Sequence, residues 1–202
     1  MTKILVTAFE PYDRWPANSS WLCLQELARD LPALPAVTTR LYPVDFAAAR
    51  ERLWHDLAAG YDFAVHLGQA PGSSAIRLEA IGLNIGPPSP SHAGQLLPLV
   101  DAAPLAYRSD LPLSQWVERL AEFGIPAQVS YHAGTYLCNA ALYWTLHRAQ
   151  QMGLRTRAVF VHLPLDVSQV AGGTEQPSLP ASTAARAVRL ILAELTSPPD
   201  RV

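Results

Sequence analysis

Cysteine is scarce in this chain of 202 residues, and so is charge. Only Cys23 and Cys138 are present, with no C-x-x-C pair, which excludes a disulfide framework and a cysteine-based structural zinc site. Charged residues make up 16% of the chain and give a formal net charge of −2 at pH 7, with the basic residues dispersed. Neither a nucleic acid nor an anionic membrane is therefore expected as a partner.

Long hydrophobic runs are also missing. No apolar run approaches the roughly 20 residues that a membrane-spanning helix needs, and the apolar start of the chain breaks into polar sequence too soon for a signal peptide. We therefore expect a cytoplasmic protein without a membrane partner, in which both cysteines are free thiols. Half of the residues are hydrophobic, which predicts a well-filled core in a single domain over 1–202.

Apolar runs alternate with segments of helical period along the chain. Strand-like runs lie at 3–8, 63–67, 127–130 and 158–162, and helix-like segments at 18–29, 47–59, 113–123, 138–149 and 181–195. This order predicts an α/β fold, a three-layer α/β/α sandwich with a mostly parallel, twisted central sheet. Two stretches rich in proline and glycine, 86–94 and 171–180, interrupt the pattern, and we interpret both as long surface loops.

Cys138 follows a small-residue turn and begins a helix-like segment. The unpaired amides and the macrodipole at a helix N-terminus favour an anion, so a thiolate should form there more readily than in a free cysteine. His162 stands at the end of another apolar run, and the segment Ala75-Ile-Arg-Leu-Glu79 offers a carboxylate. Cys138, His162 and Glu79 could together form a cysteine hydrolase site at the rim where the strands end.

Several of these residue types also have structural explanations. Cys23 lies on the apolar face of the first helix and is expected to be a small buried hydrophobe. His66 is expected to be a hydrogen-bonded core or rim histidine, whereas His132 is a rival base for Cys138. Glu79 has an alternative as a surface charge in an ion pair. The remaining histidines are expected to be exposed to solvent: His55, His92 and His147.

Four motifs occur in a characteristic order. They are Thr7-Ala-Phe-Glu-Pro-Tyr12 with Asn18-Ser-Ser, Leu67-Gly-Gln-Ala-Pro-Gly72 continuing to Glu79 and Asn84, Ser130-Tyr-His-Ala-Gly-Thr-Tyr-Leu-Cys-Asn139, and Phe160-Val-His-Leu-Pro164. Together they span nearly the whole chain and resemble the motifs of pyroglutamyl peptidase I (pyrrolidone-carboxylate peptidase). Members of this family are cytosolic cysteine peptidases that remove an N-terminal pyroglutamyl residue. The segment around Cys138 is the most specific of the four.

The resemblance implies catalytic roles for three residues. Cys138 would be the nucleophile, His162 its general base and then the acid for the leaving amine, and Glu79 the group that orients the imidazole. The family is commonly homotetrameric, so the resemblance also implies a homo-oligomer. It implies no metal and no other cofactor, because thiol chemistry needs only a reduced cysteine.

The resemblance also implies how a pyroglutamyl peptide would bind. The lactam ring would lie between Phe9 and Tyr12, and Leu137 would complete an apolar wall. The backbone at Gln69 would pair with the lactam N–H and C=O groups. A slot of this kind accepts a neutral, flat ring and rejects an ordinary charged N-terminus.

Three positions depart from the family pattern, and the mildest departure is Tyr12 in place of the usual phenylalanine. Ser73 and Ser89 stand where the family usually has arginine, and the second arginine is expected near the oxyanion. Loss of that guanidinium leaves a second hypothesis, a non-catalytic or weakly active protein that binds pyroglutamate or another small lactam. A metallohydrolase is a third, although no H-x-x-x-H or H-E-x-x-H spacing is present.

Overall fold

A six-stranded sheet forms the middle layer of the computed structural model, which describes residues 2–31, 35–87, 95–173 and 175–196. The strands, in sheet order, are β2 (Ala36–Tyr42), β1 (Lys3–Phe9), β3 (Phe63–Gln69), β8 (Arg157–Leu163), β4 (Ile76–Glu79) and β7 (Ala127–Ser130). Neighbouring strands run parallel except at the β4–β8 pair, which is antiparallel. The prediction of a mostly parallel sheet is confirmed.

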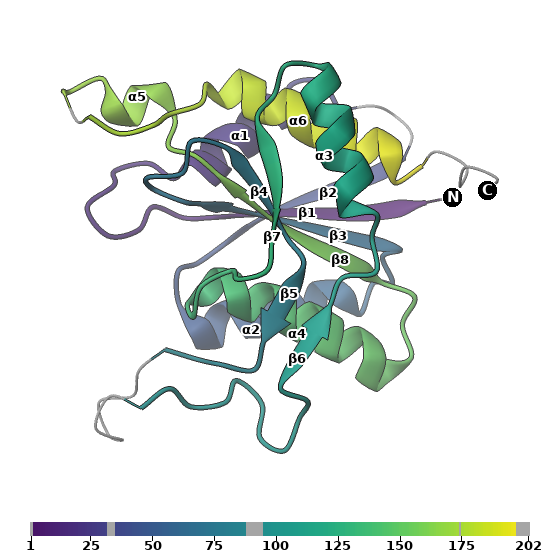
Figure 1. Cartoon of the computed structure of the whole chain (residues 1–202). Helices are drawn as coiled ribbons and strands as arrows, with labels where there is room; N and C mark the ends of the chain where they lie inside the picture. Colours follow the sequence, from purple (N-terminus) through teal and green to yellow (C-terminus); the bar gives the residue numbers. More distant parts are fainter. Residues whose placement is uncertain (1, 32–34, 88–94, 174, 197–202) are drawn as a thin grey trace.

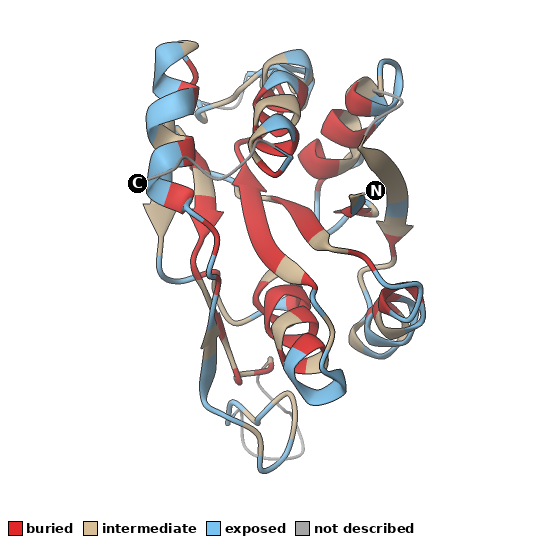
Figure 2. Cartoon of the chain, turned by 90° about the vertical axis from the view of Figure 1, so that its right-hand side faces the viewer, coloured by how far each residue is buried: buried red, intermediate tan, exposed pale blue. Residues whose placement is uncertain are grey.

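Helices cover both faces of this sheet (Figure 1). One face carries α1 (Ser19–Ala28), α3 (Leu113–Glu122) and α6 (Ala181–Glu194), and the other carries α2 (Phe46–Leu57) and α4 (Leu137–Met152). Alternate strand residues point to opposite faces, so two separate cores form, as the buried strands and inward helix faces in Figure 2 show. The three-layer α/β/α class within one domain is confirmed, while its extent over 1–202 stays a prediction.

The periodicity of the sequence does not indicate some of the shorter or less buried strands. β2 is an edge strand of mostly intermediate burial, without a continuous apolar run. A two-stranded hairpin of β5 (Ile81–Leu83) and β6 (Ala106–Arg108) is too short to show any period. The short helix α5 (Val167–Val170) precedes the stretch 171–180, whose described residues lie outside helices and strands apart from a bridge at Ser178. Of the stretch 86–94, only 86–87 is described.

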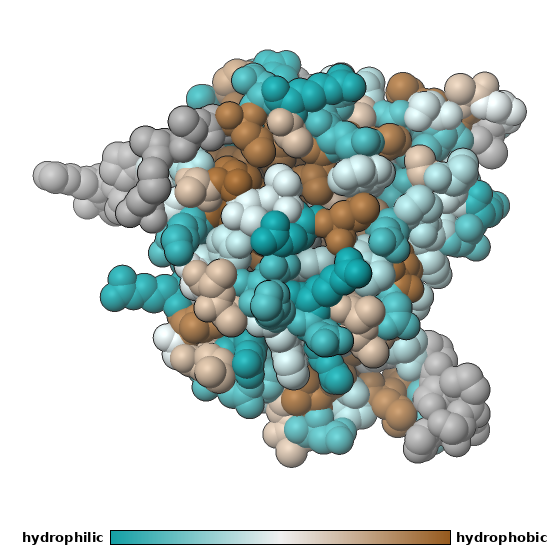
Figure 3. Space-filling view, turned by 180° about the vertical axis from the view of Figure 1, so that it is seen from behind, coloured by the Kyte–Doolittle hydropathy of each residue, from teal (hydrophilic) through white to brown (hydrophobic). Residues whose placement is uncertain are grey.

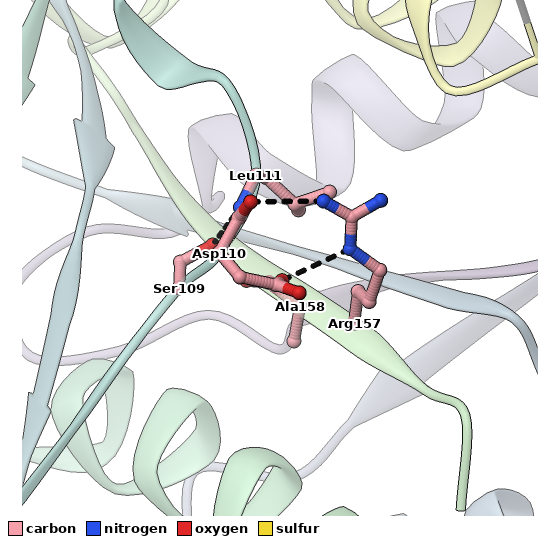
Figure 4. A network of polar contacts seen from close by, with 5 residues as sticks. All are labelled: Ser109, Asp110, Leu111, Arg157 and Ala158. Carbon is pink, nitrogen blue, oxygen red and sulfur yellow. Dashed lines mark hydrogen bonds and ion pairs between the residues drawn. The ribbon is translucent and has the colours of Figure 1, made fainter. Parts of the chain in front are cut away.

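The segment that leaves β6 is tied to β8 by the contacts in Figure 4. Arg157 Nε lies 3.0 Å from Asp110 Oδ1, and an Nη of Arg157 donates to the Asp110 carbonyl at 2.8 Å. The Ser109 hydroxyl donates to the Ala158 carbonyl at 2.6 Å. These contacts fix the chain between the hairpin and α3.

The outer surface is mixed in character. On the face seen from behind in Figure 3, apolar side chains form separate groups among hydrophilic ones. Among the described residues, no helix is long and apolar enough to cross a membrane.

Candidate active site

Cys138 is the second residue of α4, which confirms its predicted place at a helix N-terminus. The turn before it contains Gly134, whose φ of 80° suits glycine, and Tyr136 is the N-cap without a side-chain cap bond. The Ala140 amide donates to the Tyr136 carbonyl at 3.0 Å, which is the first bond of the helix. The amides before Ala140 therefore have no partner within the helix, and their partial positive charge lies beside the thiol.

His162 comes from the end of β8 and meets a carboxylate from β4. Because β4 runs antiparallel to β8, Arg77 lies opposite His162 and Glu79 lies opposite Phe160, all with side chains on the same face of the sheet. His162 Nδ1 is 2.8 Å from Glu79 Oε1, and Glu79 is fully buried. A carboxylate can only accept, so Nδ1 carries the proton and Nε2 is left to exchange a proton with a thiol. Glu79 is therefore no surface ion pair.

The charges of these groups are coupled. Burial lowers the pKa of His162, but the charge of Cys138, the hydrogen bond with Cys138 and the contact with Glu79 outweigh burial and raise it above its ordinary value. Burial raises the pKa of Glu79, whereas the hydrogen bond with His162, the nearby Ser130 hydroxyl and the charges of His162 and Arg77 bring it below its ordinary value. Both shifts favour an imidazolium beside a carboxylate at neutral pH.

The thiol of Cys138 comes close to the sheet at Gly68. Gly68 lies on β3 directly opposite His162 in the parallel register. A Cβ at this position would be 3.1 Å from Cys138 Sγ and 2.5 Å from the ring of Phe160. Any side chain here would displace the sulfur or the ring, so the absence of a side chain lets α4 bring its thiol to β8.

A cavity of about 280 Å³ opens beside Cys138 and His162. The four residues expected to bind the lactam all line it: Phe9, Tyr12, Gln69 and Leu137. Gly68, expected at the rim where the strands end, also lines it, whereas the other lining residues were given no role in the site in advance: Asp13, Trp15, Asn18, Val44, Pro71, Ala133 and Tyr136. The structure thus brings the predicted residues together, while their roles stay predictions.

The aromatic lining has a buried part and an exposed part. Phe9 is 4% exposed and stacks on Phe160 with ring centroids 6.3 Å apart. Tyr12 is 47% exposed and lies against Tyr136, with centroids 5.3 Å apart. Tyr136 precedes Leu137 in the motif around Cys138, and this position is the signal that could have identified it.

Gln69 holds the rim of the cavity through its side chain. Its Oε1 accepts from the Ser19 amide at 2.8 Å and from Gln169 Nε2 at 2.8 Å. Gln169 Nε2 also donates to the Ala17 carbonyl at 2.9 Å, so α5 is joined to the start of α1. Two protein groups already donate to Oε1 of Gln69, so this oxygen is not free to accept from a lactam N–H, which is consistent with the backbone role expected of Gln69.

Other residues considered from the sequence fall outside this cavity. His132 is exposed and its Nδ1 accepts from the Gly134 amide at 3.0 Å. Ser73 is buried, and its hydroxyl donates to the Ala75 carbonyl at 2.7 Å, a structural role. Ser89 and His92 lie outside the described residues. Within the described part of the chain, no three His, Cys, Asp or Glu side chains are grouped as metal ligands would be.

The remaining predictions for single residues have mixed outcomes. Cys23 and His66 are fully buried and His55 is exposed, as expected. The prediction that His147 is exposed is wrong, because it lies buried on α4 with Nδ1 2.9 Å from the Tyr107 hydroxyl.

Comparison with known proteins agrees with this arrangement. A family model described as pyroglutamyl peptidase matches residues 2–196. The pyrrolidone-carboxylate peptidase of Pyrococcus furiosus is 36% identical over 189 residues, covering 89% of each chain. The protein of the same name from Streptomyces coelicolor is 35% identical over 204 residues, covering 98% of this chain and 94% of that one. A crystal structure of pyrrolidone carboxyl peptidase from Fervidobacterium islandicum AW-1 superimposes with a TM-score of 0.89 at 34% identity, covering 96% of this chain and 98% of that one.

Proposed function

The chain belongs to the pyroglutamyl peptidase family of cysteine-type peptidases, and from this we propose that it hydrolyses the bond after an N-terminal pyroglutamyl residue of peptides. One observation carries the proposal: Cys138 and His162 meet at one cavity, and His162 is hydrogen-bonded to the buried Glu79. The predicted lactam-binding residues line the same cavity. A cytoplasmic location and a homotetramer are further predictions from the family.

In the first half of the reaction, the Cys138 thiolate attacks the carbonyl carbon of the scissile peptide bond, which lies outside the lactam ring. The amides at the start of α4 lie where they can stabilise the tetrahedral oxyanion, an effect worth about 2.7–4 kcal/mol per donor. The C–N bond then breaks, the His162 imidazolium gives its proton to the leaving amine, and a thioester remains on Cys138.

In the second half, water attacks the thioester. His162, now neutral, takes the proton of the water, and collapse of the intermediate releases 5-oxoproline and the thiolate. Glu79 holds Nδ1–H throughout, so Nε2 faces the reacting atoms in both halves. An intact set of these three groups argues against a protein that only binds lactams.

Substrate choice follows from the lining of the cavity. Its buried end is apolar, with Phe9 and Leu137 exposed by 4% and 2%. A pyroglutamyl ring is neutral and can enter such a slot, whereas an ordinary N-terminal ammonium would lose its hydration there at a cost of several kcal/mol. We therefore expect prolyl and glutamyl analogues to be poor substrates.

A chromogenic pyroglutamyl anilide tests this function beside its prolyl and glutamyl counterparts. The wild type should release the chromophore from the first substrate alone, and Cys138→Ala should abolish release while leaving the circular dichroism spectrum unchanged. Cys23→Ala is the matched control, because Cys23 is the other thiol and lies in the core away from the cavity. Turnover by Cys138→Ala near the wild-type rate would reject the proposal.

A further inference from the structure

Asp13 places a charge at the active-site cavity that the chemistry described above does not use. It lines the cavity, and its side chain is exposed. Its φ of 57° is a left-handed conformation that aspartate adopts more readily than most residues but glycine would adopt at lower cost. Among the described residues, none forms a hydrogen bond or an ion pair with its carboxylate. Such an outlier at a cavity is a reason to look for a functional role.

The cavity has one closed end and one open end. Phe9 and Leu137, at the closed end, are 4% and 2% exposed, whereas Tyr12 and Tyr136, at the open end, are 47% and 38% exposed. If the pyroglutamyl ring occupies the closed end, the rest of the peptide has to leave through the open end. The side chain of the second residue then lies on the side of the cavity that Asp13 lines.

Charge at the open end is mainly negative. Asp13 is the one acidic residue among those that line the cavity. A second carboxylate, Asp45, is near enough to Tyr136 to contribute, after burial and the neighbouring Tyr12, to the raised pKa of that phenol. The neighbouring Arg14 has its guanidinium carbon 5.0 Å from the centroid of the Trp15 ring, so it is held on the wall, and its one positive charge offsets only one of the two carboxylates.

We propose that Asp13 is a specificity-determining residue that favours a lysine or arginine directly after the pyroglutamyl group and disfavours an acidic residue there. The inference rests on the proposed function of the same site. Because the carboxylate is exposed, its interaction with a cationic side chain is worth about two- to fivefold in kcat/KM. The preference should weaken as ionic strength rises, since salt screens exposed charges.

Two dipeptide amides, pyroglutamyl-lysinamide and pyroglutamyl-glutamic acid amide, test this inference, with pyroglutamyl-alaninamide as the neutral reference. The ratio of kcat/KM for the lysyl and glutamyl substrates should exceed one in the wild type. It should fall toward one in both Asp13→Asn and Asp13→Gly, the second of which also suits the backbone conformation. Arg14→Gln is the matched control and should keep or raise the ratio. An unchanged ratio in Asp13→Asn would overturn the inference.

Binding to Cys138→Ala separates this inference from the proposed function. Calorimetric titration with the same peptides measures the Lys-to-Glu preference without turnover. A wild type that hydrolyses none of these peptides would refute the proposed peptidase activity. The ratio of the lysyl and glutamyl affinities would still test the proposed role of Asp13. Equal affinities for the lysyl and glutamyl peptides, or a preference that survives in the double variant with Asp13→Asn, would overturn the role of Asp13.

Discussion

Glu79 introduces a charge into a fully buried position, which is costly unless partners compensate for the lost hydration. Its Oε1 is 2.8 Å from His162 Nδ1, and the nearby Ser130 hydroxyl and Arg77 charge favour the ionised carboxylate, whereas its Oε2 has no hydrogen-bond partner among the described residues. A neutral side chain of the same shape would be easier to bury at this position. The buried charge therefore fits a role at the site, where it sets both the orientation of the imidazole and its affinity for a proton.

Glu79→Gln should lower kcat for a pyroglutamyl anilide by about a hundredfold, because the base remains but is less well oriented and less basic. Glu79 contributes to the raised pKa of His162, so its removal should lower that pKa. The alkaline limb of the kcat/KM profile, where the imidazolium loses its proton, should consequently move to lower pH. Steady-state rates between pH 5 and 10 measure both effects.

Glu122→Gln offers a comparison for this prediction, since it makes the same change at an exposed residue that pairs with Arg119. Its pH profile should match the wild type. If Glu79→Gln instead lowered the rate without moving the alkaline limb, Glu79 would act on the geometry of His162 and not on its charge.

At the scale of the elements, the position of the nucleophile depends on how α4 packs against β5. The two are so close that a Cβ on Gly82 would lie 2.7 Å from the Tyr143 amide nitrogen. Asn139, fully buried next to Cys138, accepts from the Leu83 amide at 2.8 Å and donates to the Leu83 and Ile85 carbonyls at 2.9 and 3.0 Å. In the described part of the chain, β5 has a strand partner, β6, on one edge only, and the Asn139 side chain supplies the hydrogen bonds that a second strand would make on the other edge.

Asn139→Ala should destabilise the protein by about 2–3 kcal/mol, because it leaves buried backbone groups of β5 without partners. Urea denaturation followed by tryptophan fluorescence gives the free energy of unfolding. Asn139→Asp keeps the acceptor for the Leu83 amide but places an oxygen against two carbonyls, so it should be no better than alanine. Unfolding midpoints equal to the wild type in both variants would show that β5 is held by other contacts.

Elements with long apolar runs are predictable from the sequence, and the pairings between elements are not. β1, β3, β8 and α4 are recognised from local period, and their ends place Cys138 and His162 at one rim. The antiparallel direction of β4, which carries Glu79 to His162, is set by contacts over 83 residues of sequence. Local sequence contains no signal for such a pairing.

The predictions that failed or were missed for single side chains have the same cause, which is contact between segments distant in the sequence. His147 is polar and isolated in the sequence, which suggests exposure, yet Tyr107 from β6, 40 residues earlier, supplies the partner that allows burial. Gln169 joins the site through Gln69, 100 residues away. In both cases the hydrogen-bond partner is known only once the fold has brought the distant segments together.

At the scale of the whole molecule, His66 joins the sheet to α4 at the centre of the fold. Its Nδ1 is 2.8 Å from the Thr7 hydroxyl on β1, and its Nε2 is 2.9 Å from the Thr145 hydroxyl on α4. Thr145 donates to the Ala141 carbonyl at 2.9 Å, so it accepts from Nε2–H, and Nδ1 accepts from Thr7. The imidazole is therefore satisfied as a neutral ring.

Complete burial lowers the pKa of His66 from 6.5 to about 3. The unfolded chain binds a proton at this residue below about pH 6.5, whereas the folded protein does so only near pH 3. The contribution of His66 to stability is therefore fully present above pH 6.5. It declines as the pH falls, by up to about 1.4 kcal/mol per pH unit. His147, whose pKa burial also lowers, acts in the same direction.

Other groups act in different pH ranges. The raised pKa of His162 stabilises the folded protein, and this contribution is fully present below pH 6.5. It therefore stays constant during acidification and is lost only as the pH rises. The lowered pKa of Glu79 gives stability that is lost only below its ordinary value of 4.5. The interval from pH 6.5 to 5 therefore reports mainly on the histidines that are buried in the neutral form.

His66→Gln should lower stability at pH 7, because the amide cannot reproduce both hydrogen bonds, but it should flatten the decline between pH 6.5 and 5. Urea midpoints at half-unit pH steps measure the slope, and His147→Gln gives the share of the second buried histidine. His55→Gln, at an exposed position, should leave the slope unchanged. Equal slopes for the wild type and His66→Gln would mean that the folded protein accepts a proton at the centre of its core, which an imidazole enclosed by two hydroxyls and Phe160 should resist.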